Sequence, residues 1–273
     1  MDRSAQGHGG EVPQAPVAGR PRQRRSEEDE RSLMFGLSIG VAIACLLAVY
    51  IGSTVQASIG IGLGMIASPV LAFADSDFIP VAIVISVLPL TAAVAWVERS
   101  HIEPRGVAFS LLGRFPGVVA GALVVAALSD RVVAMLVAVS VLFAVFVSIT
   151  TKRFRPTDKS LVVAGLASGF TGTTTGVGGP PMALTYQHSD PATMRSTISA
   201  FFFFGALMSI GALALAGEVG VRQWQLAAML IPGVLLGVVT ARLIQHRLDP
   251  ALIRPAVLAV CSITSVALLV GSF

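Results

Sequence analysis

Long apolar runs separated by short polar stretches make up the chain from about residue 33 onward. No Asp, Glu, Lys or Arg occurs in Leu33–Tyr50 or in Val132–Thr151. A helix needs about 20 consecutive apolar residues to span the hydrocarbon core of a bilayer. The pattern therefore predicts an all-α, polytopic helical membrane protein with about eight crossings and nine or ten helical segments. The expected segments are 33–55, 56–75, 77–97, 106–128, 131–150, 160–189, 193–216, 223–244 and 250–272.

The composition agrees with this class of protein. Hydrophobic residues make up 54% of the chain and charged residues only 12%, and the mean hydropathy is +0.81. Soluble domains carry about 25% charged residues, so about half of that charge is missing. The net charge of +4 comes from a tail and from short loops, which excludes a nucleic-acid partner. Cys45 and Cys261 lie in apolar segments without partner spacing, so we expect no disulfide, no metal site and no cofactor.

Residues 1–32 are polar, rich in Pro and Gly, and carry charges of both signs. They cannot bury enough apolar surface to fold, so they are predicted to form a disordered tail. A secretory signal is not expected, because the apolar run that follows is longer than the 7–15 residues of such a signal. We divide the remaining chain into two transmembrane repeats, 33–151 and 152–273, joined by a basic loop at 152–156.

A step of 116 residues relates three separate parts of the chain. It superposes Gly60-Ile61-Gly62 on Gly176-Val177-Gly178, Pro116-Gly117-Val118 on Pro232-Gly233-Val234, and Arg131 on Arg247. One constant offset without a gap indicates an internal duplication into two homologous halves. Interrupted helices in matching positions of two halves are the sequence sign of a transporter site at their interface.

The orientation depends on the number of passes in each half. With four crossings per half, the tail and the basic loop share a side, which then carries 13 Lys and Arg residues against five. With five crossings per half, the repeats are inverted and the split is eight against ten. The positive-inside rule favours four crossings and a cytoplasmic tail. Inverted repeats are common in transporters and stay open.

Two glycine-rich breaks interrupt the apolar segments, Gly60–Gly64 in the first half and Gly169–Pro181 in the second. Unwound backbone at membrane depth has to be buried in protein or to line a cavity. A half-helix that starts at such a break presents unpaired N–H groups and the positive end of its dipole, which favour an anion. Pro180 suits the first turn of such a half-helix, because an N–H group there has no acceptor in any case. Each break is expected to form a re-entrant or half-helix element.

Anion-binding residues are predicted in both breaks and at one cation inside a segment. Arg114 lies well within 106–128, where it could serve as a counter-charge or extend its side chain to an interface. The hydroxyls could donate to the anion or bond back to their own helix. Glycines spaced by four, such as Gly117 and Gly121, favour close helix packing. The candidate substrate-binding residues are Ser58, Gly60, Gly62, Gly64, Ser68, Arg114, Thr171, Thr173, Thr174, Thr175, Gly176, Gly178, Gly179 and Pro180.

The two breaks resemble the glycine motifs of a known transporter family. Gly-Ile-Gly-Leu-Gly at 60–64 and Gly-Phe-Thr-Gly followed by Gly-Val-Gly-Gly-Pro-Pro-Met-Ala-Leu within 169–184 are similar to those of the TauE/SafE-type sulfite exporters, also called the toluene sulfonate uptake permease family. The resemblance covers about 33–273, although Leu63 stands where many members carry another glycine. It implies transport of sulfite, sulfonates or related sulfur-containing anions across the cytoplasmic membrane.

The sequence therefore predicts a permease or exporter for a small sulfur-containing anion such as sulfite or an organosulfonate, held between opposed half-helix N-termini. Its expected partners are this anion and the lipid bilayer, and a homo-oligomer is compatible with the sequence. A channel or assembly subunit without a transport cycle is the alternative. An intramembrane enzyme is disfavoured, because the chain has no His-Glu-x-x-His motif and its membrane segments hold no carboxylate pair.

Overall fold

The structure is a computed structural model that describes residues 33–34, 37–150, 156–187, 189–244 and 250–271. The predicted tail at 1–32 and most of the basic loop at 152–156 lie outside these residues. The chain divides into two compact units, Met1–Ile39 and Gly40–Phe273. In the first unit, β1 (Leu33–Met34) pairs antiparallel with β2 (Leu37–Ser38).

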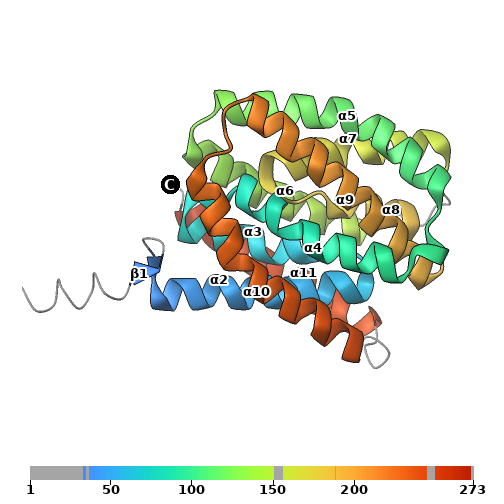
Figure 1. Cartoon of the computed structure of the whole chain (residues 1–273), viewed down its shortest axis with the longest axis horizontal. Coiled ribbons are helices and arrows are strands. Elements are labelled where there is room, and N and C mark those ends of the chain that lie inside the picture. The colour runs from blue at the N-terminus through green and yellow to red at the C-terminus, as the bar shows by residue number, and fades with distance from the viewer. Residues whose placement is uncertain (1–32, 35–36, 151–155, 188, 245–249, 272–273) are drawn as a thin grey trace, which may run out of the picture. The chain divides into compact units, whose positions relative to one another are not determined.

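Ten α-helices and two short 3-10 helices account for most of the described residues (Figure 1). The predicted all-α class and the number of helical segments are thereby confirmed. Five of the helices, α2, α5, α6, α9 and α10, are long and apolar enough to cross a membrane. In chain order the elements are α2 (Ile39–Ile59), α3 (Leu63–Ala74), η1 (Ser76–Phe78), α4 (Val81–Val97), η2 (Arg99–His101), α5 (Pro104–Ala127), α6 (Asp130–Thr150), α7 (Asp158–Thr175), α8 (Gly179–Tyr186), α9 (Pro191–Leu215), α10 (Val221–Ile244) and α11 (Pro250–Gly271).

The first glycine break lies where it was predicted, but the helix before it ends later than expected. Helix α2 continues to Ile59, beyond the expected boundary between 55 and 56, and α3 begins at Leu63. The composition does not change where α2 ends, because the residues on both sides are apolar. The position of the helix end is set by the backbone conformation of the glycines. Gly60 and Gly62 have φ angles of 91° and 153°, which glycine adopts most readily. At the second break, Gly176 ends α7 in the left-handed conformation, with its N–H group bonded to the Gly172 carbonyl.

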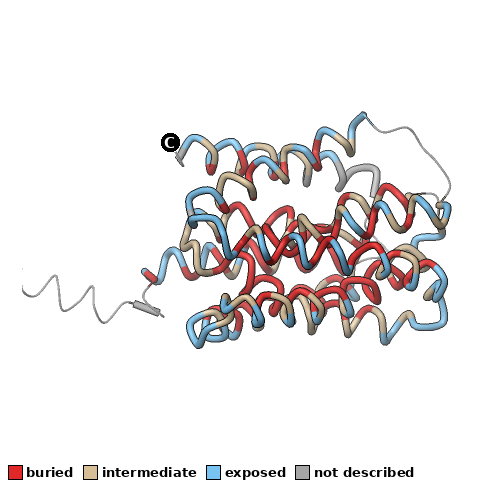
Figure 2. The backbone as a smooth tube through the Cα atoms, turned by 90° about the horizontal axis from the view of Figure 1, so that it is seen from above, coloured by how far each residue is buried: buried red, intermediate tan, exposed pale blue. Residues whose placement is uncertain are grey.

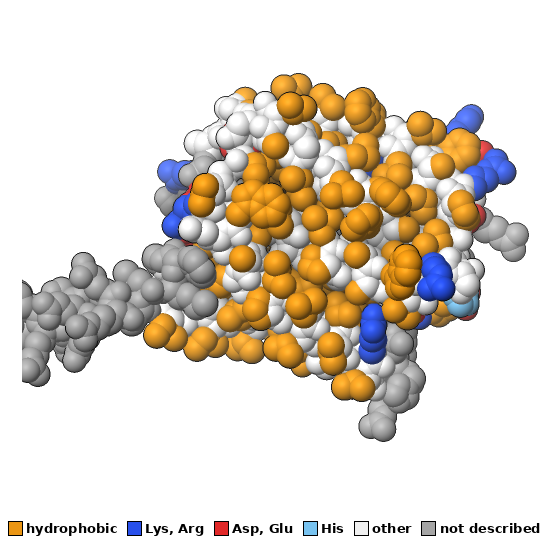
Figure 3. Space-filling model, viewed as in Figure 1, with side chains coloured by type: hydrophobic (Ala, Val, Ile, Leu, Met, Phe, Trp, Pro, Cys, Tyr) orange, Lys and Arg blue, Asp and Glu red, His pale blue; other side chains and the backbone are white. Residues whose placement is uncertain are grey.

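The helices of the second unit bury one side and expose an apolar surface on the other. Buried residues follow the inward sides of the helices (Figure 2). Large exposed side chains include Phe115 on α5 and Phe143 and Phe146 on α6, each more than 60% exposed. On the face drawn in Figure 3, hydrophobic side chains cover the middle, and the Lys and Arg side chains lie toward the ends. A water-soluble protein rarely exposes such large apolar patches, whereas lipid tails solvate them.

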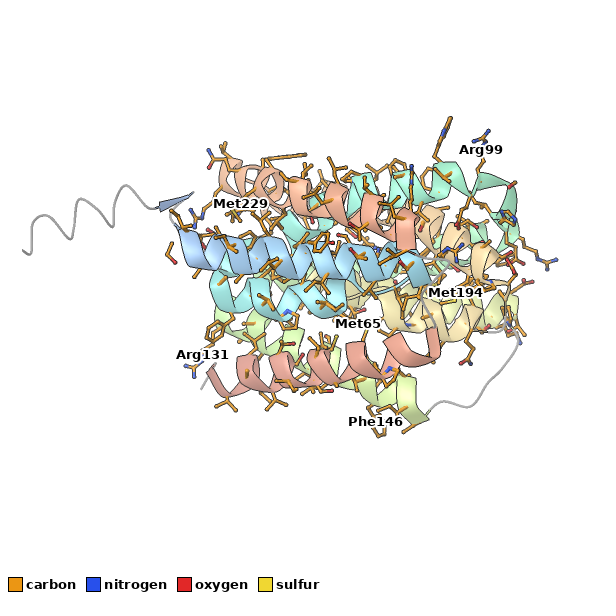
Figure 4. All side chains as sticks on the ribbon, turned by 90° about the horizontal axis from the view of Figure 1, so that it is seen from below. Met65, Arg99, Arg131, Phe146, Met194 and Met229 are labelled. Carbon is orange, nitrogen blue, oxygen red and sulfur yellow. The ribbon has the colours of Figure 1, made fainter. Side chains whose placement is uncertain are left out.

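Two clusters of ion pairs mark the opposite ends of the helices. At one end, Arg195 of α9 forms an ion pair with Glu98 at the end of α4, and we call this the Arg195 end. At the Arg222 end, Arg222 of α10 pairs with Asp75 and Asp77, which flank the start of η1. The labelled residues of Figure 4 show the same division, with Arg99 and Met194 at one end, Arg131 at the other, and Met65 between them.

Each short helix turns back along the helix that precedes it. Ala57, near the end of α2, shares a small cavity with Glu98 at the Arg195 end, but α3 leads to Asp75 at the Arg222 end. A Cβ atom at Gly52 would lie 3.0 Å from the Cα of Leu63, so α3 starts beside the middle of α2. Helices of 12 and eight residues, such as α3 and α8, are about 18 and 12 Å long, well short of the bilayer core.

The course of the first five helices matches the five-pass alternative. After α3 returns to the Arg222 end, α4, α5 and α6 alternate between the ends. Thr150 of α6 and Asp158 of α7, which pairs with Arg105, therefore lie at the Arg195 end. Gly40 of α2 lies at the other end. The four-pass count took each glycine break as a re-entrant element, whereas α3 leads from the first break to Asp75 at the Arg222 end. With five passes in each half the Lys and Arg split is eight against ten, and the cytoplasmic tail stays a prediction of the four-pass count.

Helices α5 and α7 pack backbone to backbone through glycines on both. Cβ atoms at Gly113 and Gly117 would overlap the carbonyl oxygens of Val162 and Leu166, and a Cβ at Gly165 would overlap that of Ser110. Small residues allow this close approach, which drives helix association where lipid supplies no hydrophobic effect. The packing expected for Gly117 is thereby confirmed.

Helices α2 and α10 approach each other in a similar way. Cβ atoms at Gly233 and Gly237 would lie 2.9 and 2.7 Å from the carbonyl oxygens of Leu46 and Tyr50. The hydroxyl groups of Tyr50 and Thr240 add a hydrogen bond of 3.2 Å. Residue numbers rise together along both helices of this pair and of the α5–α7 pair, so the two helices of each pair run parallel.

Replacing Gly113 by Ala is expected to destabilise the protein by about 1–3 kcal/mol, the usual cost of overpacking. The thermal unfolding midpoint of the purified protein in detergent measures the effect. Gly211→Ala on α9 is the matched control, because a Cβ there meets nothing within 4 Å. Its midpoint should stay the same or rise, since Ala is the better helix former. Equal midpoints for the two variants would contradict the close packing of α5 on α7.

Candidate anion site

A cavity of about 50 Å³ lies where the two glycine breaks meet. A Cβ at Gly64 would overlap the carbonyl oxygen of Gly176, so the start of α3 touches the end of α7. Apolar side chains of α4 and α9 close the remaining walls. The lining residues are Gln56, Gly62, Leu63, Gly64, Met65, Ile83, Val84, Val87, Arg114, Gly172, Gly176, Gly178, Gly179, Phe202 and Ala206.

Helices α3 and α8 both begin at this cavity. Gly64 and Met65 are the second and third residues of α3, and Gly178 and Gly179 are the N-cap and first residue of α8. In the described part of the chain, the N–H groups of these four residues have no acceptor. Such groups, with the positive end of each helix dipole, attract an anion. Pro180 and Pro181, as predicted, occupy the first turn of α8, where they have no N–H group to leave unpaired.

The side chain of Arg114 is buried beside the same cavity, with only 4% of its surface exposed. Its Nη1 donates a hydrogen bond of 3.2 Å to the hydroxyl of Ser168, which in turn donates one of 2.6 Å to the carbonyl of Gly178. The guanidinium carbon lies 4.8 Å from the ring centre of Phe201 and 5.9 Å from that of Phe202. This burial excludes the alternative in which the side chain extends to an interface.

The charge of Arg114 is not neutralised by the residues that the structure describes. None of their ion pairs includes it, and its Nε and Nη2 atoms make no hydrogen bond there. A buried charge without a partner costs several kcal/mol. The aromatic rings recover part of this by cation–π attraction, about 2 kcal/mol where the cation is desolvated. The geometry therefore leaves a cation with free donors next to two helix N-termini.

Two glycines hold the guanidinium in place. A Cβ at Gly205 of α9 would overlap Nε of Arg114, and one at Gly169 of α7 would lie 2.5 Å from the Arg114 carbonyl oxygen. Larger residues at either position would displace α5 or its arginine. Gly169 was predicted as the start of the second break, but it lies inside α7, which continues to Thr175, and its lack of a side chain there admits α5.

The structure brings six of the fourteen predicted site residues to the cavity: Gly62, Gly64, Arg114, Gly176, Gly178 and Gly179. The other eight lie outside its lining. Gly60 lies by the backbone of Arg195 at the Arg195 end, and the hydroxyl of Ser68 is buried near Gly176 without a partner among the described residues. Pro180 follows the lining glycines of α8.

The remaining hydroxyls bond within the protein. Ser58 donates to the Thr54 carbonyl at 2.7 Å, and Thr171, Thr174 and Thr175 likewise donate to carbonyls one turn earlier in α7. Thr173 shares a hydrogen bond of 2.8 Å with Ser209 of α9. These hydroxyls therefore bond to carbonyls of their own helices, or in the case of Thr173 to α9, and do not point to a ligand.

Besides aliphatic side chains of the walls, three polar or aromatic side chains at the site were not singled out in the sequence. Gln56 and Phe202 line the cavity, and Ser168 connects Arg114 to the second break. Gln56 could have been found from the sequence, because it is the one amide side chain in the apolar segment that precedes the first break. Phe202 stands in a run of four phenylalanines followed by Gly205, but nothing in such a run indicates which ring faces a cation.

The arrangement is suited to binding rather than to a covalent reaction. Its polar groups are backbone N–H groups, a guanidinium and an amide, and none of the described residues that line the cavity carries a carboxylate, thiol or imidazole. Among the residues that the structure describes, no group of three His, Cys, Asp or Glu could hold a metal ion. What the site offers is a set of donors and one positive charge.

A family model described as sulfite exporter TauE/SafE matches residues 44–268. The chain belongs to the TauE/SafE sulfite exporter family. No curated protein and no solved structure gives a significant match. The TauE/SafE family consists of membrane exporters or permeases for sulfur-containing anions and is not an enzyme family. The protein is thus a multi-pass membrane protein of a transporter family.

Gly205→Ala is expected to push the guanidinium of Arg114 out of its place, because the added Cβ would overlap Nε. In thermal unfolding assays with increasing sulfite, the upward shift of the midpoint should shrink or disappear. Gly211→Ala on the same helix should keep the shift of the unmodified protein. A full sulfite response in Gly205→Ala would mean that Gly205 does not set the position of this charge.

Proposed function

We propose that the protein is a secondary carrier of the cytoplasmic membrane that binds a sulfur oxoanion of about the size of sulfite between the N-termini of α3 and α8. In this proposal Arg114 supplies the counter-charge. The N–H groups of Gly64, Met65, Gly178 and Gly179 donate to the anion's oxygens. The observation that carries the proposal is the buried, unneutralised guanidinium at a cavity where two helices begin.

The balance of charge supports an anion as the ligand. Each helix N-terminus acts as roughly half a positive charge, and Arg114 adds one more. In lipid-depth surroundings this concentration of positive charge would be costly unless a negative ligand occupied the site at some stage of the cycle. The free Nε and Nη2 donors of Arg114 are the groups that form charge-assisted hydrogen bonds to oxoanions.

The size of the cavity supports an inorganic anion over a bulky organosulfonate. One water molecule needs about 10–15 Å³ by the same measure, so a cavity of about 50 Å³ has room for roughly four non-hydrogen atoms. Sulfite has four. An arylsulfonate would require Phe202 or Ile83 to move, since both belong to the walls.

The helix arrangement supports alternating access through two inverted halves. The bounds of α5 and α10 correspond under the step of 116 residues to within one residue, yet α5 starts at the Arg195 end and α10 at the Arg222 end. Inverted halves with a site between discontinuous helices are a common carrier design, in which one half moves against the other. The proposed halves are those predicted, 33–151 and 152–273.

Counterflow in proteoliposomes tests the carrier proposal. Unlabelled sulfite inside the vesicles should accelerate the uptake of labelled sulfite, because a carrier returns faster when loaded. Equal uptake with and without internal sulfite would instead indicate a channel. Absence of any sulfite flux above empty liposomes would reject sulfite as a substrate.

Arg114→Gln should raise the half-saturation concentration for sulfite about 10- to 100-fold, since hydrogen bonds to charged groups contribute about 1.5–3 kcal/mol. Initial rates of labelled sulfite uptake measure it. Arg105→Gln is the matched control on the same helix, because Arg105 forms an exposed ion pair with Asp158 away from the cavity. An unchanged half-saturation in Arg114→Gln would remove this residue from the binding site.

A further inference from the structure

Gln56 lies near the end of α2 and lines the cavity with only 5% of its surface exposed. Its side-chain Oε1 accepts a hydrogen bond of 2.9 Å from the N–H group of Leu63, the first residue of α3. The side chain therefore spans the first glycine break and fixes the start of α3 against α2. The protein itself thus satisfies one N–H group at this helix N-terminus.

The same hydrogen bond sets the orientation of the amide. Because Oε1 is committed to Leu63, the two donors on Nε2 are directed elsewhere, and among the described residues they have no acceptor. An amide nitrogen can donate two hydrogen bonds but accept none. Buried polar groups nearly always have a hydrogen-bond partner. A donor pair at the wall of a cavity is therefore suited to an oxygen of a bound ligand.

The corresponding position in the second half offers no such donor. The step of 116 residues places Gln56 on Gly172, which also lines the cavity but has no side chain. A Cβ at Gly172 would lie 3.4 Å from Nη2 of Arg114, so the guanidinium occupies the space on that side. The cavity therefore has a charged donor group on one wall and a neutral one at the first break.

We propose that Gln56 is a specificity-determining residue that donates from Nε2 to an oxygen of the transported anion, while its Oε1 holds the start of α3. This inference rests on the proposed anion site. It adds that Gln56 determines which anions the site accepts. Gln56 recognises an unprotonated oxygen without adding charge. A ligand that presents a methyl group or a hydroxyl proton at this point leaves the amide donors unpaired.

Sulfite and methanesulfinate provide the comparison, because a methyl group of methanesulfinate stands where sulfite has its third oxygen and both have four non-hydrogen atoms. A site that hydrogen-bonds its ligand rejects an analogue that leaves the bond unmade. In wild-type protein, unlabelled sulfite should therefore compete with labelled sulfite more strongly than methanesulfinate does. Gln56→Met removes the donors with little change of size, so it should weaken sulfite more than methanesulfinate and reduce this preference about tenfold or more.

Gln56→Glu separates the two roles of the side chain. A carboxylate can still accept from the Leu63 N–H group, so the break should keep its form. It cannot donate, and it repels an anion, so labelled sulfite uptake should lose about tenfold or more in apparent affinity. Gln225→Glu, on an exposed part of α10, adds the same charge away from the cavity and should leave the uptake unchanged.

The outcomes distinguish this inference from the proposed function. If wild-type protein moves sulfite but Gln56→Glu matches it, or if Gln56→Met weakens both anions equally, Gln56 is only a cap for α3 and the inference is overturned. If wild-type protein moves no sulfite, the proposed function fails first. A Gln56→Glu variant that retains its thermal midpoint but no longer gains stability from added sulfite would support the inference independently of flux.

Discussion

A guanidinium buried at the depth of the bilayer needs a counter-charge, and the surroundings of the cavity follow from that need. Arg114 lies under Phe201 and Phe202, and its hydrogen bond to Ser168 leads on to the turn at Gly178. Two helix N-termini add further positive potential. In the proposed function, an anion bound at this cavity offsets that positive charge, so ligand binding and the stability of this part of the protein are expected to be coupled.

Close glycine packing makes this centre possible. The contacts of Gly113 and Gly117 on α5 with the backbone of α7 bring Arg114 against Ser168, about two turns before α7 ends at Gly176. Gly205 then leaves room for the guanidinium between α5 and α9. With a side chain at any of these places the helices would separate and the arginine would lose its aromatic neighbours. The glycines outside the cavity thus matter as much to the site as those that line it.

Much of the fold could be predicted because a membrane segment is recognised by length and polarity alone. The segments 77–97, 131–150 and 223–244 agree with α4, α6 and α10 to within a few residues. The break at Gly60–Gly62 was predicted correctly, but the end of the helix before it, at Ile59, was predicted four residues too early, because the apolar composition does not change there. Composition also does not determine the number of passes in each half, because whether α3 continues or reverses α2 depends on the backbone angles at Gly60 and Gly62.

The sequence by itself determined the membrane class, the two glycine breaks and Arg114 as a cation within an apolar segment, because the apolar runs are long and each break or charge is a local exception to them. Only the tertiary structure decided which groups share the cavity. The threonines of the second break bond back to their own helix or to Ser209, whereas Gln56, with no distinctive neighbours, spans the first break. The reason is physical. Hydrogen-bond partners of a buried hydroxyl or amide are chosen by distances between helices, which composition and spacing along the chain do not specify.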